Sequence, residues 1–151
     1  MRPTISLCLC LFVFSLVSLA DEAPSKAARP NVVVIIADDL GWADIGYNNE
    51  RVYSPHLDRL ASEGVRFDQH YVMPQCTPTR VALMTGRYPS RFGGAALMAS
   101  NEPSFPIGTP TLASTLQKAG YRTALSGKWH LGSGPEHGPN HFGFDSSYGS
   151  L

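Results

Sequence analysis

The chain has 151 residues, of which 43% are hydrophobic and 16% are charged. This composition is typical of a globular protein and excludes a disordered tail, a collagen-like array and a coiled coil, and the length allows one domain at most. The 12 Lys and Arg residues balance the 12 Asp and Glu residues, so bulk charge gives no reason to expect nucleic acid or an anionic membrane as a partner. Any chemistry on anions must therefore rest on local clusters of residues.

Residues 1–20 have the pattern of an export signal peptide. A basic start precedes a mostly apolar run over residues 5–19, and small residues stand where a signal peptidase cleaves, next to Ala20. The run is too short to span a bilayer, so we expect cleavage without a retained membrane anchor, and a periplasmic, secreted or, in a eukaryote, lysosomal protein. Residues 21–30 are expected to form a linker. Cleavage would leave Cys76 as the single thiol of the mature chain.

From residue 31 onward, the pattern predicts alternating strands and helices. Val32–Ile36 is a β-branched run, typical of a strand buried on both faces of a parallel sheet, and residues 65–71 and 121–126 have strand-like patterns. Helices are expected after three pairs that offer a capping residue and a first-turn proline, each followed by a glycine able to end the helix. These pairs and glycines are Ser54-Pro55 with Gly64, Thr77-Pro78 with Gly86, and Thr109-Pro110 with Gly120. The order predicts an α/β fold with an open, mostly parallel sheet flanked by helices.

Three polar clusters fall at the ends of expected strands or on an adjoining loop, where ligands bind in such sheets. They are Asp38-Asp39, Cys76–Arg80 and Lys128–His130.

The segment Cys76-Thr77-Pro78-Thr79-Arg80 has the pattern C-x-P-x-R and resembles the signature of the sulfatase family. Three further segments resemble the same family in the same order. They are residues 29–41 (RPNVVVIIADDLG), 54–67 (SPHLDRLASEGVRF) and 120–132 (GYRTALSGKWHLG). The resemblance implies an alkaline-phosphatase/sulfatase-like fold, of which residues 31–151 would be the N-terminal portion of the catalytic domain.

The resemblance also implies that Cys76 is the precursor of the nucleophile. In that family, a separate formylglycine-generating enzyme oxidises the signature cysteine to formylglycine. One hydroxyl of the hydrated aldehyde attacks the sulfur of a sulfate ester, and the other lets the bound sulfate leave by elimination. Pro78 and Arg80 would be read by the modifying enzyme, and Arg80 would then hold the hydrated aldehyde. The alternatives are a buried structural thiol and a surface arginine.

Asp38 and Asp39 form an acidic pair where the first expected strand ends. A turn at this point would bring both carboxylates to one cation, and ligands that are all oxygen suit calcium or magnesium. From the resemblance we expect calcium in preference to magnesium, with residue 76 as a further ligand. The alternative is a polar turn or a helix cap.

Lys128 and His130 flank Trp129, so on extended backbone they point the same way while the tryptophan points into the protein. The resemblance implies that Lys128 binds the substrate sulfate and the nucleophile. It also implies that His130 helps to hold the hydrated aldehyde, although a histidine near an aromatic ring is more often structural.

These residues predict hydrolysis of an aryl or carbohydrate sulfate ester, in a sulfated small molecule or glycan, to an alcohol and inorganic sulfate. Two alternatives stay open: a phosphodiester or phosphonate ester hydrolase of the same superfamily, and a non-catalytic remnant. Members of the family are longer, and a later segment completes their metal site. We therefore expect this chain alone to bind calcium poorly, to turn over slowly or not at all, and to be poorly stable.

Overall fold

A computed structural model describes residues 29–151. The expected signal peptide and residues 21–28 of the expected linker lie outside the described residues. The chain divides into two units after residue 35, and each is described by itself. Among residues 29–151, no helix is both long enough and apolar enough to cross a membrane.

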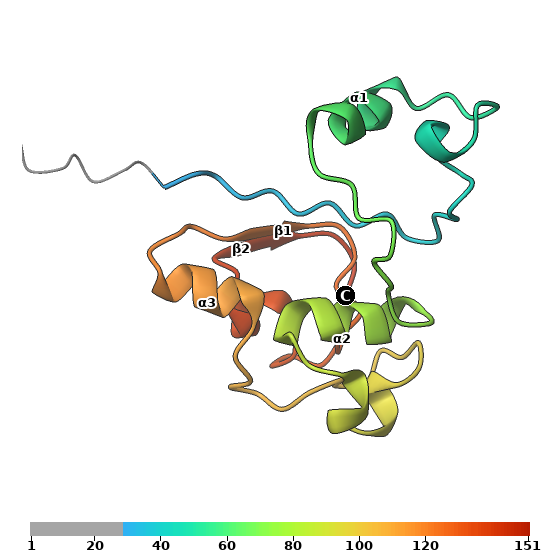
Figure 1. The fold of residues 1–151 in the computed structure, drawn as a ribbon. Helices are drawn as coiled ribbons and strands as arrows, with labels where there is room; N and C mark the ends of the chain where they lie inside the picture. Colours follow the sequence, from blue (N-terminus) through green and yellow to red (C-terminus); the bar gives the residue numbers. More distant parts are fainter. Residues whose placement is uncertain (1–28) are drawn as a thin grey trace, which may run out of the picture. The chain divides into compact units, whose positions relative to one another are not determined.

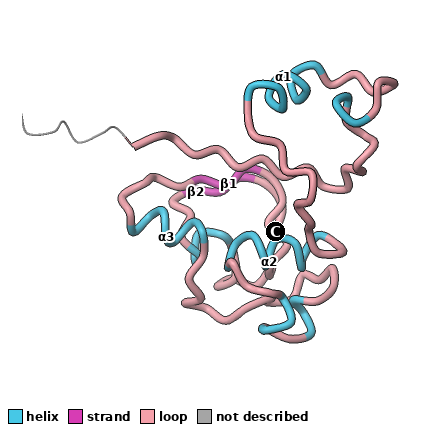
Figure 2. Tube along the Cα trace, in the orientation of Figure 1, coloured by secondary structure: helices cyan, strands magenta, loops and turns pink. Residues whose placement is uncertain are grey.

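Three α-helices form in residues 36–151, at the places that the proline pairs predict (Figure 2). They are α1 (Pro55–Glu63), α2 (Cys76–Thr85) and α3 (Leu112–Lys118), and short 3-10 turns lie at Gly46–Asn48, Pro89–Arg91, Gly94–Ala96 and Pro139–Phe142. Local chemistry explains two of the boundaries. The Thr111 hydroxyl accepts a hydrogen bond from the Ser114 amide at the start of α3, and Gly86 ends α2 in the left-handed region at φ 66°.

The α1 boundaries depart from the prediction in detail. Gly64 has φ −115° and is extended, so the left-handed cap expected there is wrong. Ser54 makes no capping bond to the helix backbone. Its hydroxyl donates to Asp58 and accepts from the Gly46 amide, which ties α1 to the turn before it.

A two-stranded parallel sheet joins β1 (Ala124–Ser126) to β2 (Ser146–Tyr148). Leu125 pairs with Ser147 in the ladder. Figure 1 shows α2 and α3 on one side of this pair. Leu125 packs against the core while its neighbours on the strand are exposed, so the helices cover one face of the sheet, as in an α/β fold.

Two of the expected strands do not form. Residues 32–36 have no regular secondary structure, and Val33 and Ile35 are about four-fifths exposed, at 81% and 80%. Residues 65–71 are also irregular and contain a turn. The physical reason is that β-branched residues favour extended backbone, but a strand exists only where a neighbour supplies hydrogen bonds. Within the described residues, β1 and β2 pair only with each other.

The hydrophobic core lies between α2, α3 and the segment that follows β1. Val81 and Met84 of α2 pack there with Ala113 of α3. Trp129 is the largest fully buried side chain of the described residues. Its ring stacks on Phe142 at a centroid distance of 5.7 Å, so the segment that carries Lys128 and His130 is anchored in the core.

Candidate active site

Cys76 is the first residue of α2 and is half-buried. The turn before it is held by Thr79, whose hydroxyl lies 2.8 Å from the carbonyl oxygens of both Met73 and Gln75. The thiol therefore stands at the N-terminal end of a helix, where free amides and the positive end of the helix dipole favour an anion.

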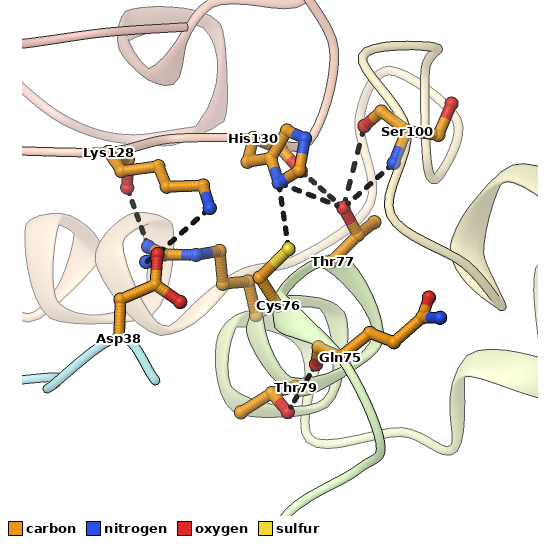
Figure 3. Close-up of polar contacts among 9 residues, drawn as sticks. Asp38, Gln75, Cys76, Thr77, Thr79, Ser100, Lys128 and His130 are labelled. Atoms are coloured by element: carbon orange, nitrogen blue, oxygen red, sulfur yellow. Dashed lines mark hydrogen bonds and ion pairs between the residues drawn. The ribbon is translucent and has the colours of Figure 1, made fainter. Parts of the chain in front are cut away.

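The residue facing the Cys76 thiol is His130, which lies 54 positions away in the sequence. Its Nδ1 atom is 3.2 Å from the sulfur (Figure 3). His130 has φ 56°, a left-handed conformation that is uncommon outside glycine. The alternation expected after β1 is present, because Trp129 is 2% exposed while the side chains on either side of it reach the Cys76 region.

Two cations and one carboxylate complete this cluster. Lys128 Nζ donates to Asp38 Oδ2 at 2.8 Å. Arg80 donates from one terminal nitrogen to the Lys128 carbonyl at 2.6 Å, and its other terminal nitrogen is 3.6 Å from Asp38 Oδ2. The structure thus brings Asp38, Arg80, Lys128 and His130 to the N-terminal end of α2, with more positive than negative charge.

Arg80 carries an unused donor. Its side chain is only 10% exposed, and its Nε is the one buried side-chain nitrogen or oxygen in residues 29–151 without a hydrogen-bond partner. Arg80 follows Cys76 by four positions, so the two lie on the same face of α2. A buried N–H without an acceptor is costly, so this donor is available to an oxygen acceptor close to the Arg80 side chain.

The charges of the cluster shift its pKa values in consistent directions. The hydrogen bond from Lys128 holds the pKa of Asp38 below its usual value, and the same bond raises the pKa of Lys128. Burial, followed by the charges of Lys128 and Arg80, lowers the pKa of His130. Near neutral pH the lysine and the carboxylate are therefore both ionised, whereas the imidazole is uncharged.

The region around Asp38 offers the kind of ligand that a divalent cation needs, but too few ligands to hold one. Asp38 and Asp39 offer carboxylate oxygens at a bend, which suits calcium or magnesium. Asp38, however, is paired with Lys128. Within residues 29–151, no group of three or more His, Cys, Asp and Glu side chains is placed to hold a metal.

Sequence reasoning missed Thr77, which contacts His130 and Ser100. One signal could have found it. Thr77, Arg80, Val81 and Met84 are buried at helical spacing, so the threonine belongs to the inner face of α2 rather than to its surface.

Comparisons with known proteins show which family this chain is similar to. The family model described as "Sulfatase" matches residues 30–151. Human steryl-sulfatase is 45% identical over 144 residues, which cover 85% of this chain and 25% of that protein. Bovine arylsulfatase A is 45% identical over 126 residues, covering 80% of this chain and 25% of that protein.

Solved structures are similar in fold. The crystal structure of Ps i-CgsB in complex with k-i-k-neocarrahexaose has a TM-score of 0.67 and 40% identity, and the match covers 76% of this chain and 26% of that one. This chain thus spans about a quarter of the length of the relatives it matches.

Proposed function

The chain belongs to the sulfatase family, and on this basis we propose that it carries the nucleophile and the sulfate-binding side chains of a sulfate ester hydrolase. The family generally uses a formylglycine and a divalent metal ion. The proposed reaction converts an aryl or carbohydrate sulfate ester and water into an alcohol and inorganic sulfate. The solved relative in complex with k-i-k-neocarrahexaose supports the carbohydrate part of this substrate class.

The observation that carries the proposal is the set of groups around residue 76. His130 Nδ1 lies 3.2 Å from the sulfur, Lys128 is near it, and Arg80 presents a buried N–H without an acceptor. A thiol offers that donor only a weak acceptor. A residue 76 with oxygen atoms, as in a hydrated formylglycine, would give the Arg80 donor a partner, and this supports the conversion of Cys76 by a formylglycine-generating enzyme.

Each side chain then has a task that follows from its charge. The hydrated aldehyde supplies one hydroxyl to attack sulfur and a second to let sulfate leave by elimination. Lys128 is a cation close to residue 76 and neutralises sulfate oxygens. His130 is uncharged near neutral pH because its pKa is lowered, and its Nδ1 faces residue 76, where it can share a hydrogen bond with a hydroxyl of that residue. Arg80 orients that residue through charge-assisted hydrogen bonds.

For the metal ion, we propose calcium before magnesium, with Asp38, Asp39 and the oxygens of residue 76 as the ligands that this chain contributes. Two carboxylates do not satisfy a cation that takes six or more oxygens, so these ligands alone do not complete the metal site. The sequence of residues 1–20 supports an exported enzyme.

The test uses the natively expressed protein with two chromogenic substrates, p-nitrophenyl sulfate and bis-p-nitrophenyl phosphate. We expect faster hydrolysis of the sulfate and complete loss of that activity in Cys76→Ala. Lys128→Met should lower kcat/KM. Lys118→Met removes an exposed lysine at the end of α3 and should leave kcat/KM unchanged.

Two results would contradict the proposal. Preferential turnover of the phosphodiester would move the chain to the other substrate class. An absence of turnover with either ester, together with an intact thiol at residue 76, would indicate a remnant without catalysis.

A further inference from the structure

Thr77 lies directly after the proposed nucleophile, at a position that the C-x-P-x-R pattern leaves unspecified. Its side chain is fully buried, at 0% exposure. Its hydroxyl oxygen is 3.3 Å from His130 Nδ1 and 3.1 Å from the His130 carbonyl oxygen. One hydroxyl thus contacts both the ring and the backbone of the same histidine (Figure 3).

His130 needs such support more than an ordinary residue does. Its φ of 56° is in the left-handed region, which costs energy for a residue with a side chain and persists only where surrounding contacts hold it. The same residue must keep Nδ1 at 3.2 Å from Cys76. A contact that fixes the carbonyl and the ring together therefore determines where this nitrogen points.

The Thr77 hydroxyl also reaches a third segment of the chain. It accepts a hydrogen bond from the Ser100 amide at 3.3 Å and lies 3.4 Å from the Ser100 carbonyl oxygen. On the other side of Cys76, the side-chain oxygen of Gln75 accepts from the Ala99 amide at 2.8 Å. The residues that flank the thiol therefore both tie the loop at residues 99–100 to the start of α2.

A hydroxyl has one hydrogen and two lone pairs, so the Ser100 amide occupies one lone pair. The single hydrogen is then shared by the carbonyl oxygens of His130 and Ser100, at 3.1 and 3.4 Å, and the second lone pair can accept from Nδ1 of the His130 ring. Valine has the same branched shape as threonine and none of these hydrogen-bonding groups. Replacing the hydroxyl by a methyl group would thus free both the ring and the backbone of His130 without opening a cavity.

We propose that Thr77 is a positioning residue: its buried hydroxyl, seated on the loop at residue 100, holds the ring and the left-handed backbone of His130 against residue 76. Thr77 acts through the histidine and needs no contact with substrate. The consequence for turnover rests on the proposed function, whereas the consequence for the His130 ring does not.

The test compares three variants of the natively expressed protein. Thr77→Val removes the hydroxyl and keeps the shape, and Thr77→Ser keeps the hydroxyl. Thr85→Val makes the same chemical change on the same helix, at a hydroxyl that donates to the Val81 carbonyl within α2 and has no contact with His130. The readouts are the imidazole nitrogen NMR signals of His130, the formylglycine content at residue 76 by mass spectrometry, and kcat and KM for p-nitrophenyl sulfate.

We expect Thr77→Val to move the His130 Nδ1 signal and to lower kcat on the order of 10- to 100-fold at equal formylglycine content, because small misplacements of a reacting group have effects of this size. KM should change little. Thr77→Ser should keep the His130 Nδ1 signal and kcat close to those of the wild type, and Thr85→Val should leave both unchanged. A fall in formylglycine content that accounts for the whole loss of activity would assign Thr77 to maturation and overturn the proposal.

The proposal also fails if the His130 signal is the same in Thr77→Val as in the wild type, or if Thr77→Ser is as impaired as Thr77→Val. Should the valine variant not fold, Thr77→Ser and Thr77→Ala, which differ by the hydroxyl alone, answer the same question. If the wild type hydrolyses no sulfate ester, the proposed function fails, and the ring signal still decides the role of Thr77.

Discussion

Trp129 should be a sensitive core position, because it is buried between the two site residues Lys128 and His130. Its side chain is 2% exposed, and its indole N–H donates to the His137 carbonyl at 2.7 Å. Trp129→Phe keeps an aromatic ring and leaves that partly buried carbonyl without its donor, which should lower the free energy of unfolding by about 1–3 kcal/mol. Trp129→Ala also leaves a cavity in the core and should lower the free energy of unfolding by about 3–5 kcal/mol.

The assay is urea unfolding of the natively expressed protein, followed by far-ultraviolet circular dichroism, since the substitution removes a fluorophore. The matched control is Trp42→Phe, which changes the other tryptophan of the chain, 75% exposed. A change at such an exposed position should stay within about 0.5 kcal/mol. Domains are typically stable by only about 5–15 kcal/mol, so the alanine variant should lose much of its cooperative transition. Equal urea midpoints for Trp129→Phe and Trp42→Phe, at equal slopes, would refute the reasoning.

Three further predictions follow from other contacts. Arg80→Lys replaces a guanidinium that reaches the Lys128 carbonyl, so at equal formylglycine content kcat/KM for p-nitrophenyl sulfate should fall roughly 10- to 100-fold; an unchanged value would contradict this. Backbone and side-chain hydrogen bonds lower the pKa of Asp145, so its stabilising effect exists above the ordinary carboxylate pKa and is lost as the pH falls through the lower folded value. In urea titrations at several pH values, the loss in free energy of unfolding caused by Asp145→Asn should be largest near neutrality and vanish in acid. A loss that grows in acid would contradict a lowered pKa of Asp145. Thr111→Ala removes the α3 cap and should cost about 0.5–2 kcal/mol in the same titration, which an unchanged midpoint would disprove.

The helices were predictable because their signals are local. A proline near the first turn and a residue able to end the helix lie within one short segment, and α2 and α3 begin and end within a few residues of the expected places. The caps themselves differ from the expected Thr77 and Thr109: they are Gln75 for α2 and Thr111 for α3, and Pro110 precedes α3. The grouping of the site was predictable for a related reason. Trp129 must be buried, and the alternation of side chains on extended backbone then sends Lys128 and His130 to the other side.

The expected strands failed because strand formation is not local. Residues 32–36 have the composition of a buried strand, but the sheet of the described residues pairs only β1 with β2. No pattern within the segment reveals whether a neighbouring strand will be present. The sequence therefore predicted the class of the fold, which the comparisons with sulfatase structures confirm, but not the extent of its sheet.

The details of the site also lay beyond the sequence. No residue pattern indicates the left-handed conformation of His130. The contact between Thr77 and His130 joins positions 53 residues apart, and the C-x-P-x-R pattern leaves Thr77 unspecified. The pairing of Asp38 with Lys128 spans 90 residues. Such contacts depend on how α2 and the segment after β1 pack on the common core, which becomes visible only in three dimensions.

The chemical state of residue 76 in the natively exported protein is the most direct test of the proposed chemistry. Intact mass spectrometry with fragmentation around residue 76, combined with labelling by an aldehyde-specific hydrazide, distinguishes a formylglycine from a cysteine. We expect the aldehyde at residue 76, with no labelling in Cys76→Ala. An unmodified thiol in an otherwise mature protein would contradict the assignment of Cys76 as the precursor of the nucleophile.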